Sequence, residues 1–279
     1  MLNLLLAIAS SAAVSVTMRL SEGKVRNNIA MLMVNYIMCA ALSWAYADFG
    51  SPVPNVPGMP LMAGLGMVNG VLYLAGFVLL QHNVRTNGVV LSSTFIKLGL
   101  LVSMVVSVVF FGERPGAGQW LGFTMAVAAI VLMNFRPGEG KAGNALGLVL
   151  LLLAGGGGDA MSKVFEELGN PALSDHFLLM TFFVAFLICA GMILSGKAGK
   201  PEKWEVFYGL VIGIPNFFSA KFLLGALKDI AAVIVYPVYS VATILTVTLA
   251  GVLLFREKLE KRQWTALGII LLALVLLNL

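Results

Sequence analysis

The sequence predicts an all-α integral membrane protein in which ten transmembrane helices form two five-helix repeats, one inverted relative to the other. Three observations lead to this prediction. Of the 279 residues, 59% are apolar and 11% are charged, whereas an ordinary soluble domain carries about 25% charged residues. Apolar stretches close to the ~20 residues that cross a bilayer recur throughout the chain. The second half of the chain also repeats the first.

The ten helices are expected where apolar stretches alternate with short polar connectors. Their approximate ranges are 2–18, 30–47, 61–80, 88–111, 119–135, 145–166, 177–195, 205–227, 231–255 and 264–279. The connectors are too short to hold a soluble domain, which excludes an extramembrane enzyme. Cys39 and Cys189 both fall inside predicted spans, where a thiol usually fills space as an apolar side chain, so we expect no disulfide.

The repeat is clearest in the last two helices of each half. Residues Phe111, Glu113, Gln119, Trp120, Ala129, Val131, Leu132 and Asn134 recur 144 positions later as Phe255, Glu257, Gln263, Trp264, Ala273, Val275, Leu276 and Asn278. Arg19 and Glu22 match Lys163 and Glu166 at the same offset. We therefore divide the chain into repeats at 1–137 and 143–279.

Each repeat has an odd number of spans, and this fixes the relation between the two. If both repeats share one fold, the second must lie upside down relative to the first, about a pseudo-two-fold axis in the membrane plane. Such symmetry supplies two interchangeable access states. A duplicated membrane unit of this kind is typical of transporters.

The basic residues lie mainly on one side of the predicted topology. The odd-numbered connectors carry Arg19, Lys24, Arg26, Arg85, Arg136, Lys141, Lys197, Lys200, Lys203, Arg256, Lys258, Lys261 and Arg262, against Arg114, Lys163 and Lys228 on the other side. The positive-inside rule then predicts that both termini lie outside the cytoplasm. These residues are scattered over separate loops without interleaved aromatic residues, which argues against binding of nucleic acid.

A helix that ends in Phe-Phe-Gly-Glu or Leu-Phe-Arg-Glu, followed by a short polar loop and Gln-Trp, occurs twice in this ten-helix chain. This pattern resembles the drug/metabolite transporter superfamily, in its EamA-like branch, over essentially the whole chain. The resemblance implies a central cavity lined mainly by helices 1, 3, 4, 6, 8 and 9, with helices 5 and 10 at the periphery. Better-known relatives are drawn with both termini in the cytoplasm, opposite to the orientation that the charges predict.

Lys97 is the most informative polar residue of the predicted membrane core. It lies near the middle of the fourth span, with Ser93 one turn before it and Ser103 and Ser107 further along roughly the same side. A lysine so far from a helix end cannot easily reach water, so it must face a cavity or a partner. We interpret Lys97 and Ser93 as substrate-binding residues; the alternative is a structural anchor for nearby backbone.

The ninth span carries a polar face. Tyr236, Tyr239, Ser240, Thr243 and Thr246 are spaced so that they lie on one side of the helix. Pro237 lies within this stripe and frees a backbone carbonyl. Interrupted helices of this kind are sequence pointers to a transporter site, and we assign the first four residues to substrate binding. The alternative is that the hydroxyls bond back to their own helix.

Four further residues are candidates in the third and eighth spans. Asn69 and Tyr73 lie one turn apart and could contact a ligand, although Gly66 and Gly70 nearby also fit close helix packing. Asn216, beside Pro215, is a further binding candidate, and Lys221 is nearer the helix end and is a candidate for the vestibule.

Asp159 is the one carboxylate well inside a predicted span, and we consider it a candidate coupling group. The structural alternative is an ion pair with Lys163 one turn later. The run Gly155 to Gly158 would permit close helix approach or local unwinding. No nucleotide-binding, metal-binding or nucleophile motif occurs, and His82 and His176 are isolated, so neither a metal nor a cofactor is expected.

These features predict an alternating-access transporter of the bacterial inner membrane for a small polar, zwitterionic or anionic metabolite. Organic-cation exporters of the same superfamily keep a glutamate in their first helix, where this chain has only serines and a threonine, so multidrug or cation efflux is the alternative transport function. A non-transporting sensor or structural protein is the alternative outside transport. Helices 5 and 10 could support a homodimer.

Overall fold

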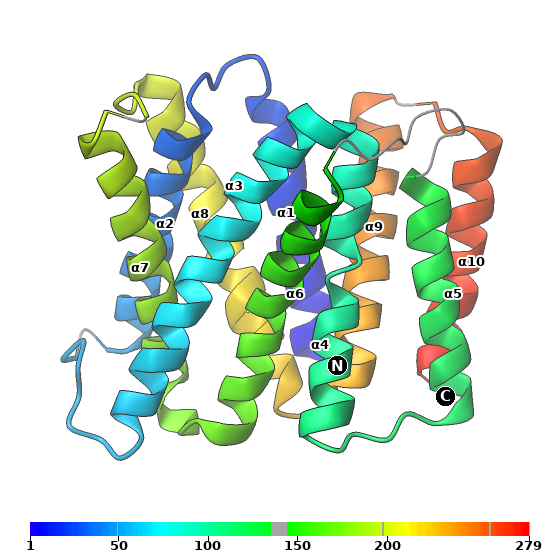
Figure 1. Ribbon diagram of the computed structural model, residues 1–279, viewed down its shortest axis with the longest axis horizontal. Helices are drawn as coiled ribbons and strands as arrows, with labels where there is room; N and C mark the ends of the chain where they lie inside the picture. Colours follow the sequence, from blue (N-terminus) through cyan, green and yellow to red (C-terminus); the bar gives the residue numbers. More distant parts are fainter. Residues whose placement is uncertain (49, 135–143, 197, 257, 279) are drawn as a thin grey trace. The chain divides into compact units, whose positions relative to one another are not determined.

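The computed structural model describes residues 1–48, 50–134, 144–196, 198–256 and 258–278, and in that part of the chain helices are joined by turns and irregular loops (Figure 1). The helices are α1 Leu2–Ser21, α2 Asn28–Tyr46, α3 Met59–Lys97, α4 Leu100–Phe110, α5 Ala117–Asn134, α6 Ala145–Leu168, the 3₁₀ helix η1 Pro171–Leu173, α7 Ser174–Leu194, α8 Lys203–Leu227, α9 Ala232–Phe255 and α10 Lys261–Leu277. Positions that the sequence interpretation used but that lie outside the described residues are Phe135, Arg136, Pro137, Lys141, Gly143, Lys197, Glu257 and Leu279.

Eight helical segments within the described residues are long and apolar enough to cross a membrane, and a shorter apolar helix, Ala117–Met133, adds to them. The prediction of an all-α membrane protein is therefore confirmed, while the number of ten spans remains a prediction. The hydrocarbon core of a bilayer leaves no water to satisfy peptide groups, which is why an apolar chain of this length folds into helices.

The third helix differs from the sequence prediction. Two spans, 61–80 and 88–111, were expected to be separated by a loop. Instead, the backbone stays helical through the polar connector and breaks at Gly88 (φ 81°, ψ 162°), so that α3 contains two helical pieces. The candidate spans are accordingly Met59–Gly88 and Leu91–Phe110. The connector contains no earlier glycine or proline, and polar residues alone do not end a helix. Asn83 donates to the carbonyl oxygens of Leu79 and Gly147, which satisfies this buried polar side chain.

The chain forms two compact units. Unit 1 contains residues 1–74 and 164–226, and unit 2 contains residues 75–163 and 227–279. Each unit takes helices from both sequence repeats, because α2 packs on α7 in unit 1, while α5 packs on α10 and α4 on α9 in unit 2 (Figure 1). These are the helices that occupy equivalent places in the two repeats. In these three pairs, a helix packs on its repeat partner.

In unit 1, glycines let helices approach without intervening side chains. A Cβ atom at Gly213 of α8 would lie 2.6 Å from the Cβ atom of Met38 on α2, and one at Gly70 of α3 would lie 2.5 Å from the carbonyl oxygen of Thr181 on α7. Both distances are too short for a side chain. Small residues take this role in membranes because close backbone contact maximises van der Waals packing.

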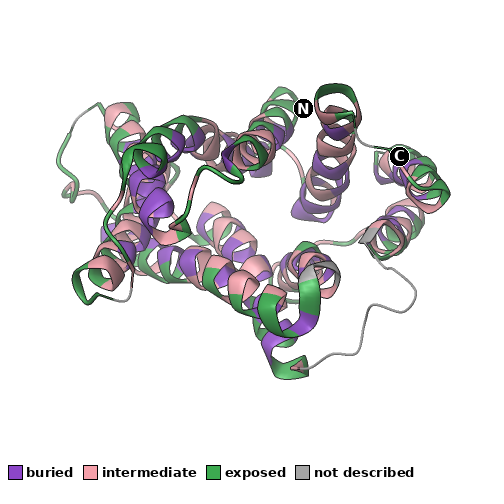
Figure 2. Ribbon diagram, turned by 90° about the horizontal axis from the view of Figure 1, so that it is seen from above, coloured by how far each residue is buried: buried purple, intermediate pink, exposed green. Residues whose placement is uncertain are grey.

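In unit 2, α5 and α10 bury one face each and leave the other exposed (Figure 2). Ala126, Ala129 and Ile130 of α5 are completely buried, whereas Leu271 and Val275 of α10 are more than half exposed. An exposed apolar face is the expected outer surface of a helix in contact with lipid.

The α4 and α6 backbones of unit 2 touch at two glycines. A Cβ atom at Gly156 would overlap the carbonyl oxygen of Gly99, and one at Gly99 would lie 2.7 Å from the backbone nitrogen of Gly156. Ser103 adds a hydrogen bond of 3.2 Å to the carbonyl oxygen of Gly156. The glycine run of α6 thus serves close approach, and α6 remains an unbroken helix from Ala145 to Leu168.

We expect Gly156→Ala to destabilise the protein by about 3 kcal/mol, because the added methyl group would displace backbone rather than a flexible side chain. Gly268→Ala is the matched control, since a Cβ atom there meets nothing within 4 Å and alanine favours a helix by up to about 1 kcal/mol. Unfolding of both variants in detergent should show a large loss of stability for Gly156→Ala and none for Gly268→Ala. Equal melting of Gly156→Ala and wild type would contradict the helix contact.

Candidate functional site

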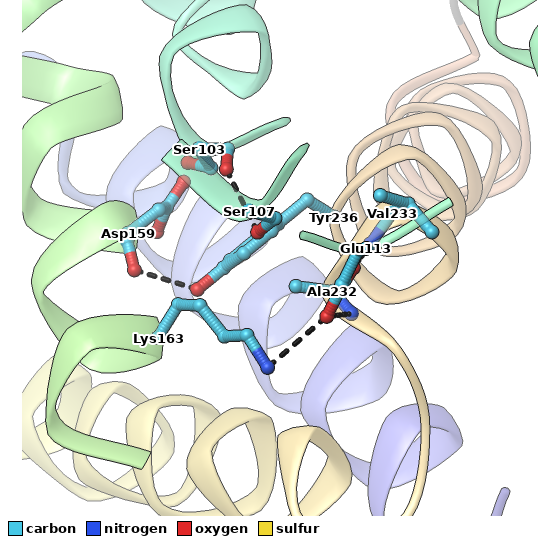
Figure 3. A network of polar contacts seen from close by, with 8 residues as sticks. All are labelled: Ser103, Ser107, Glu113, Asp159, Lys163, Ala232, Val233 and Tyr236. Carbon is cyan, nitrogen blue, oxygen red and sulfur yellow. Dashed lines mark hydrogen bonds and ion pairs between the residues drawn. The ribbon is translucent and has the colours of Figure 1, made fainter. Parts of the chain in front are cut away.

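The loop after α4 places Glu113 against the first turn of α9 (Figure 3). Gly112, with φ of +68°, turns the chain at the end of the helix. The Glu113 carboxylate accepts hydrogen bonds from the backbone N–H groups of Ala232 (3.0 Å) and Val233 (2.9 Å). These donors have no partner inside their own helix, and the carboxylate also complements the positive end of the helix dipole.

Lys163 of α6 completes this cluster. Its Nζ atom lies 3.0 Å from Glu113 Oε1, and its side chain is 4% exposed. The ammonium group also lies 6.0 Å from the ring centroid of Phe111. A buried ammonium group requires such a partner, because desolvation of an isolated charge costs several kcal/mol. Phe111, Glu113 and Lys163 all belong to the sequence repeat. That repeat indicated the duplication and the family resemblance, and it did not predict this cluster.

The pairing of Lys163 corrects the structural alternative considered for Asp159. That alternative joined Asp159 to Lys163, but Lys163 pairs with Glu113 instead. The backbone carbonyl of Asp159 accepts a hydrogen bond of 2.6 Å from the Tyr236 hydroxyl (Figure 3). For its carboxylate, no hydrogen bond or ion pair is found within the described residues.

On the polar face of α9, some hydroxyl groups make hydrogen bonds and others make none among the described residues. Tyr236 is 1% exposed and holds α6 through its hydroxyl, and Thr246 bonds back to Ala242. The hydroxyls of Ser240 and Thr243 have no hydrogen bond within the part of the chain that the structure describes, and Thr243 is buried. Tyr239 is half-buried and has an interaction of its own.

Lys97 lies where the fourth span is interrupted. The helical piece that begins after Gly88 ends at Lys97, and α4 resumes at Leu100. Gly99 N–H donates to the carbonyl oxygen of Ile96 at 3.2 Å, an i to i−3 bond of the tighter 3₁₀ type. The Lys97 side chain is exposed, and no hydrogen bond or ion pair of it is found among the described residues.

The serines near Lys97 have different surroundings. Ser103 and Ser107 are completely buried, with Ser103 bonded to α6 and Ser107 bonded back to the carbonyl oxygen of Ser103. They therefore serve helix packing. Ser93 is half-buried and has an interaction within the described residues, and its assignment to substrate binding stays a prediction.

In unit 1, Asn69 and Tyr73 of α3 both contact α7. Asn69 is 1% exposed and donates to the Thr181 hydroxyl at 3.3 Å, although its Oδ1 atom has no partner in the described residues. The Tyr73 ring packs edge-on against Phe182 at a centroid distance of 5.9 Å. These contacts favour helix packing for both residues.

Asn216 and Lys221 of α8 also have partners in unit 1. The Asn216 amide donates to Asn35 Oδ1 at 3.3 Å. The Lys221 ammonium pairs with Asp175 of α7 at 2.5 Å and lies 4.0 Å from the ring centroid of Tyr46. Lys221 is one-quarter exposed, so it is held by the protein near the helix end.

No group of three or more histidine, cysteine or carboxylate side chains that could hold a metal ion is found in the described ranges. Cys39 and Cys189 are buried free thiols. The geometry of unit 2 favours binding of a ligand. Among the described residues, Lys97 on α3, Asp159 on α6 and the hydroxyls of Ser240 and Thr243 on α9 have no side-chain partner.

Breaking the Glu113–Lys163 pair should strongly destabilise the protein. We expect Glu113→Ala to lower the free energy of unfolding by about 3–5 kcal/mol, because Lys163 would remain buried without its counter-charge and two α9 N–H groups would lose their acceptor. Chemical denaturation in detergent measures this loss.

The double variant Glu113→Gln/Lys163→Met should recover most of that stability, since the buried charges are removed together and an acceptor remains near α9. Arg262→Ala is the comparison, because Arg262 pairs at 3.4 Å with a carboxylate that is 56% exposed, and such pairs contribute up to about 1 kcal/mol. Additive losses in the double variant would show that the two side chains do not interact.

Comparison with known proteins agrees with this architecture. The model of the EamA-like transporter family matches residues 1–135 and again residues 141–279. A crystal structure of 16% sequence identity superposes with a TM-score of 0.73, covering 99% of this chain and 94% of that chain. At this identity the likeness shows the fold alone.

Two relatives are similar in sequence. An uncharacterized protein of Haemophilus influenzae is 24% identical over 283 residues, covering 96% of this chain and 94% of that protein. The probable 4-amino-4-deoxy-L-arabinose-phosphoundecaprenol flippase subunit ArnE of Hamiltonella defensa is 33% identical over 109 residues, which is 37% of this chain and 96% of that protein. The family model covers nearly the whole chain, and this multi-pass membrane protein therefore belongs to the EamA-like transporter family.

Proposed function

We propose that the chain is a secondary transporter that moves a small polar metabolite, zwitterionic or anionic, by alternating access. The observation that carries this proposal is Lys97. It is an exposed cation within a membrane-spanning segment, Leu91–Phe110, and no described residue pairs with it. An intramembrane charge without a protein partner is expected to meet a ligand or to line a water-filled path.

The local backbone supports this role for Lys97. The 3₁₀ turn at Leu98 and Gly99 interrupts the helix directly after the lysine, and discontinuous helices form the substrate sites of many transporters. Ser240 and Thr243 on α9, the helix that packs on α4, add two hydroxyls without partners among the described residues. Together they offer a positive charge and neutral hydrogen-bonding groups to a polar solute.

Lys97 and Asp159, for which no partner is found among the described residues, lie close in the chain to one backbone contact. Lys97 precedes Gly99 by two residues, and Asp159 follows Gly156 by three, while Gly99 and Gly156 touch. Each charge thus lies within about one helical turn of the same crossing. A zwitterionic ligand would offer an opposite charge to each of them, which favours that class among the polar metabolites.

Asp159 can also be interpreted as the group that carries a coupling proton. A carboxylate without a cationic partner in a membrane helix can exchange a proton at lower energetic cost than one held in an ion pair. The same carboxylate favours organic-cation efflux as the second candidate function, since it could bind a cation directly. Ligand class and proton coupling distinguish these two functions.

The relatives are compatible with transport of a charged polar group. The name of the flippase subunit contains both an amino sugar and a phosphate, which are groups of opposite charge on one molecule. We further propose the bacterial inner membrane as the location. A homodimer would use the exposed faces of α5 and α10, since their other faces pack together within unit 2.

Ligand-induced stabilisation of the purified protein tests the role of Lys97. A panel of amino acids, nucleosides, sugars, organic acids and quaternary amines is screened, because a ligand at 100 times its Kd stabilises the native state by about 2.7 kcal/mol. We expect an anionic or zwitterionic hit in wild type and its loss in Lys97→Ala, which should melt within about 0.5 kcal/mol of wild type without ligand.

Lys228→Ala is the matched control, because it removes the same charge from the exposed turn between α8 and α9 and should keep the ligand response. Lys97→Arg preserves the positive charge and should keep part of the ligand response. A hit that survives Lys97→Ala would remove Lys97 from the site, and stabilisation by quaternary amines alone would favour cation efflux instead.

Transport in vesicles tests Asp159 separately. With the ligand identified above, wild-type protein should accumulate substrate when a pH gradient is imposed, whereas Asp159→Asn should lose that response and keep substrate exchange at zero gradient. Asp229→Asn, in the exposed α8–α9 turn, should behave as wild type. Gradient-driven accumulation by Asp159→Asn would show that the coupling proton is carried elsewhere.

A further inference from the structure

Unit 1 contains an apolar pocket that the transport site does not explain. It lies between α2, α7 and the loop that follows α2, and its volume is about 390 Å³. The lining residues are Ala40, Ala41, Trp44, Pro52, Val53, Leu179, Met180 and Phe183. A volume in this range accommodates a small molecule or part of a larger one, and the lining offers almost no polar group to orient a soluble metabolite.

The pocket exists because side chains of different size face each other. On α2, Ala40 and Ala41 stop at the Cβ atom, while Trp44 one turn later is 41% exposed. On α7, Met180 and Phe183 reach further out, and Phe183 is 45% exposed. The two alanines leave a hollow between the larger side chains, which form its rim.

The loop wall of the pocket is held in place by side chains from three other segments. We call residues 50–58 the strap. Trp44 Nε1–H donates to the carbonyl oxygen of Gly50 at 2.9 Å, and His176 Nε2–H donates to that of Ser51 at 3.2 Å. Asn170 donates to the carbonyl oxygen of Pro57 at 3.1 Å. The strap also contains three prolines, which restrict its backbone, so the wall is preformed.

The pocket is continuous with the membrane surface of unit 1. Both α2 and the segment Pro171–Leu194 are candidate membrane spans. Beyond the rim, Ile37 on α2 is 45% exposed and Leu187 on α7 is 49% exposed. Exposed apolar side chains on membrane-spanning helices meet hydrocarbon, and the hollow opens among them.

The depth of the pocket fits the outer part of a lipid chain. Trp44 lies two residues before the end of α2 and Ala40 lies six residues before it, so the pocket reaches about 9 Å from the helix end at 1.5 Å per residue. Tryptophan near a helix end is typical of the membrane–water interface. A lipid whose headgroup lies at that interface would place the first part of its acyl chain at this depth.

We propose that this pocket binds the acyl chain of a membrane phospholipid at a defined position against α2, α7 and the strap. The apolar lining selects hydrocarbon, and the exposed apolar side chains around it, on membrane-spanning helices, make lipid its neighbour. Binding of this chain would fill the gap that Ala40 and Ala41 leave and would support the strap. The residues of this pocket belong to unit 1, whereas Lys97 and Asp159 belong to unit 2.

Photolabelling tests the proposal on the full chain in phospholipid vesicles. The probe is phosphatidylethanolamine with a diazirine on one acyl chain, close to the ester, and labelled residues are identified by mass spectrometry. In wild type we expect label concentrated on Leu179, Met180 and Phe183. The shallower hollow of about 220 Å³ lined by Leu101, Met104, Val105, Val108, Val109, Trp120 and Phe123 in unit 2 has no strap and should receive only the background label of exposed residues.

Two variants distinguish a bound lipid from the general lipid surroundings. Ala41→Phe fills the hollow from its exposed side, and labelling of Met180 should fall to the level of Leu187. Ile37→Phe places the same ring on the same helix face one turn away, outside the lining, and should leave Met180 labelling unchanged.

Equal labelling of Met180 and Leu187 in wild type would overturn the proposal, whether or not Ala41→Phe folds. Loss of Met180 label upon addition of a transport ligand, with no loss upon addition of unlabelled phospholipid, would also overturn it, because the occupant would then be the substrate. The first result does not bear on Lys97 and leaves the proposed transport function untouched. The second would place substrate in unit 1, and the ligand screen with Lys97→Ala then shows separately whether Lys97 also binds it.

Discussion

A charged side chain inside a membrane finds few partners, and this structure depends on that constraint. Glu113 and Lys163 satisfy each other where α4, α6 and α9 meet, and Lys221 is satisfied by Asp175 and Tyr46 in unit 1. Removal of Glu113 would take the carboxylate from a lysine whose side chain is 4% exposed, which is the costlier case, while Lys221 is one-quarter exposed. Each pair joins helices that the chain brings together from distant positions in the sequence.

The repeated motif has a physical role beyond ancestry. Glu113 belongs to the first repeat, while Lys163 and α9 belong to the second, so one carboxylate joins segments from both halves inside unit 2. The packing of α2 on α7 and of α5 on α10 follows the same rule. Sequence repeat and compact unit are thus different divisions of one chain, and the units interleave the repeats.

Much of the fold could be predicted from the composition and from the spacing of apolar residues, because a bilayer permits few kinds of secondary structure. Apolar length alone located most helices to within a few residues. The break before the fourth span was predicted correctly at residue 88. The end of the third span was misplaced because residues 81–87 are polar and resemble a loop, whereas Asn83 is satisfied inside unit 2 and the helix continues to Gly88. Polarity indicates exposure only where no buried partner exists, and the partner here lies 64 residues away in the sequence.

The candidate site was harder to predict for the same reason. Asn69, Tyr236 and Lys97 are equally unexpected in an apolar helix, yet Asn69 binds Thr181 and Tyr236 binds the backbone of α6. The spacing of these residues predicts which face of their own helix they occupy, but it gives no information on the residues of the helix packed against that face. An intramembrane polar group indicates a ligand only when the protein leaves it unsatisfied.

Among the candidates in unit 2 that the sequence predicted, and within the described residues, that criterion retains Lys97, Asp159, Ser240 and Thr243. It separates them from the tyrosine and the serines that hold α4, α6 and α9 together. The bonded groups make the surroundings of the unsatisfied ones rigid, because each hydrogen bond joins two helices or stiffens one. Preorganised surroundings lower the entropy that a ligand must lose on binding. Packing residues and binding residues therefore belong to one arrangement, in which the first hold the second in place.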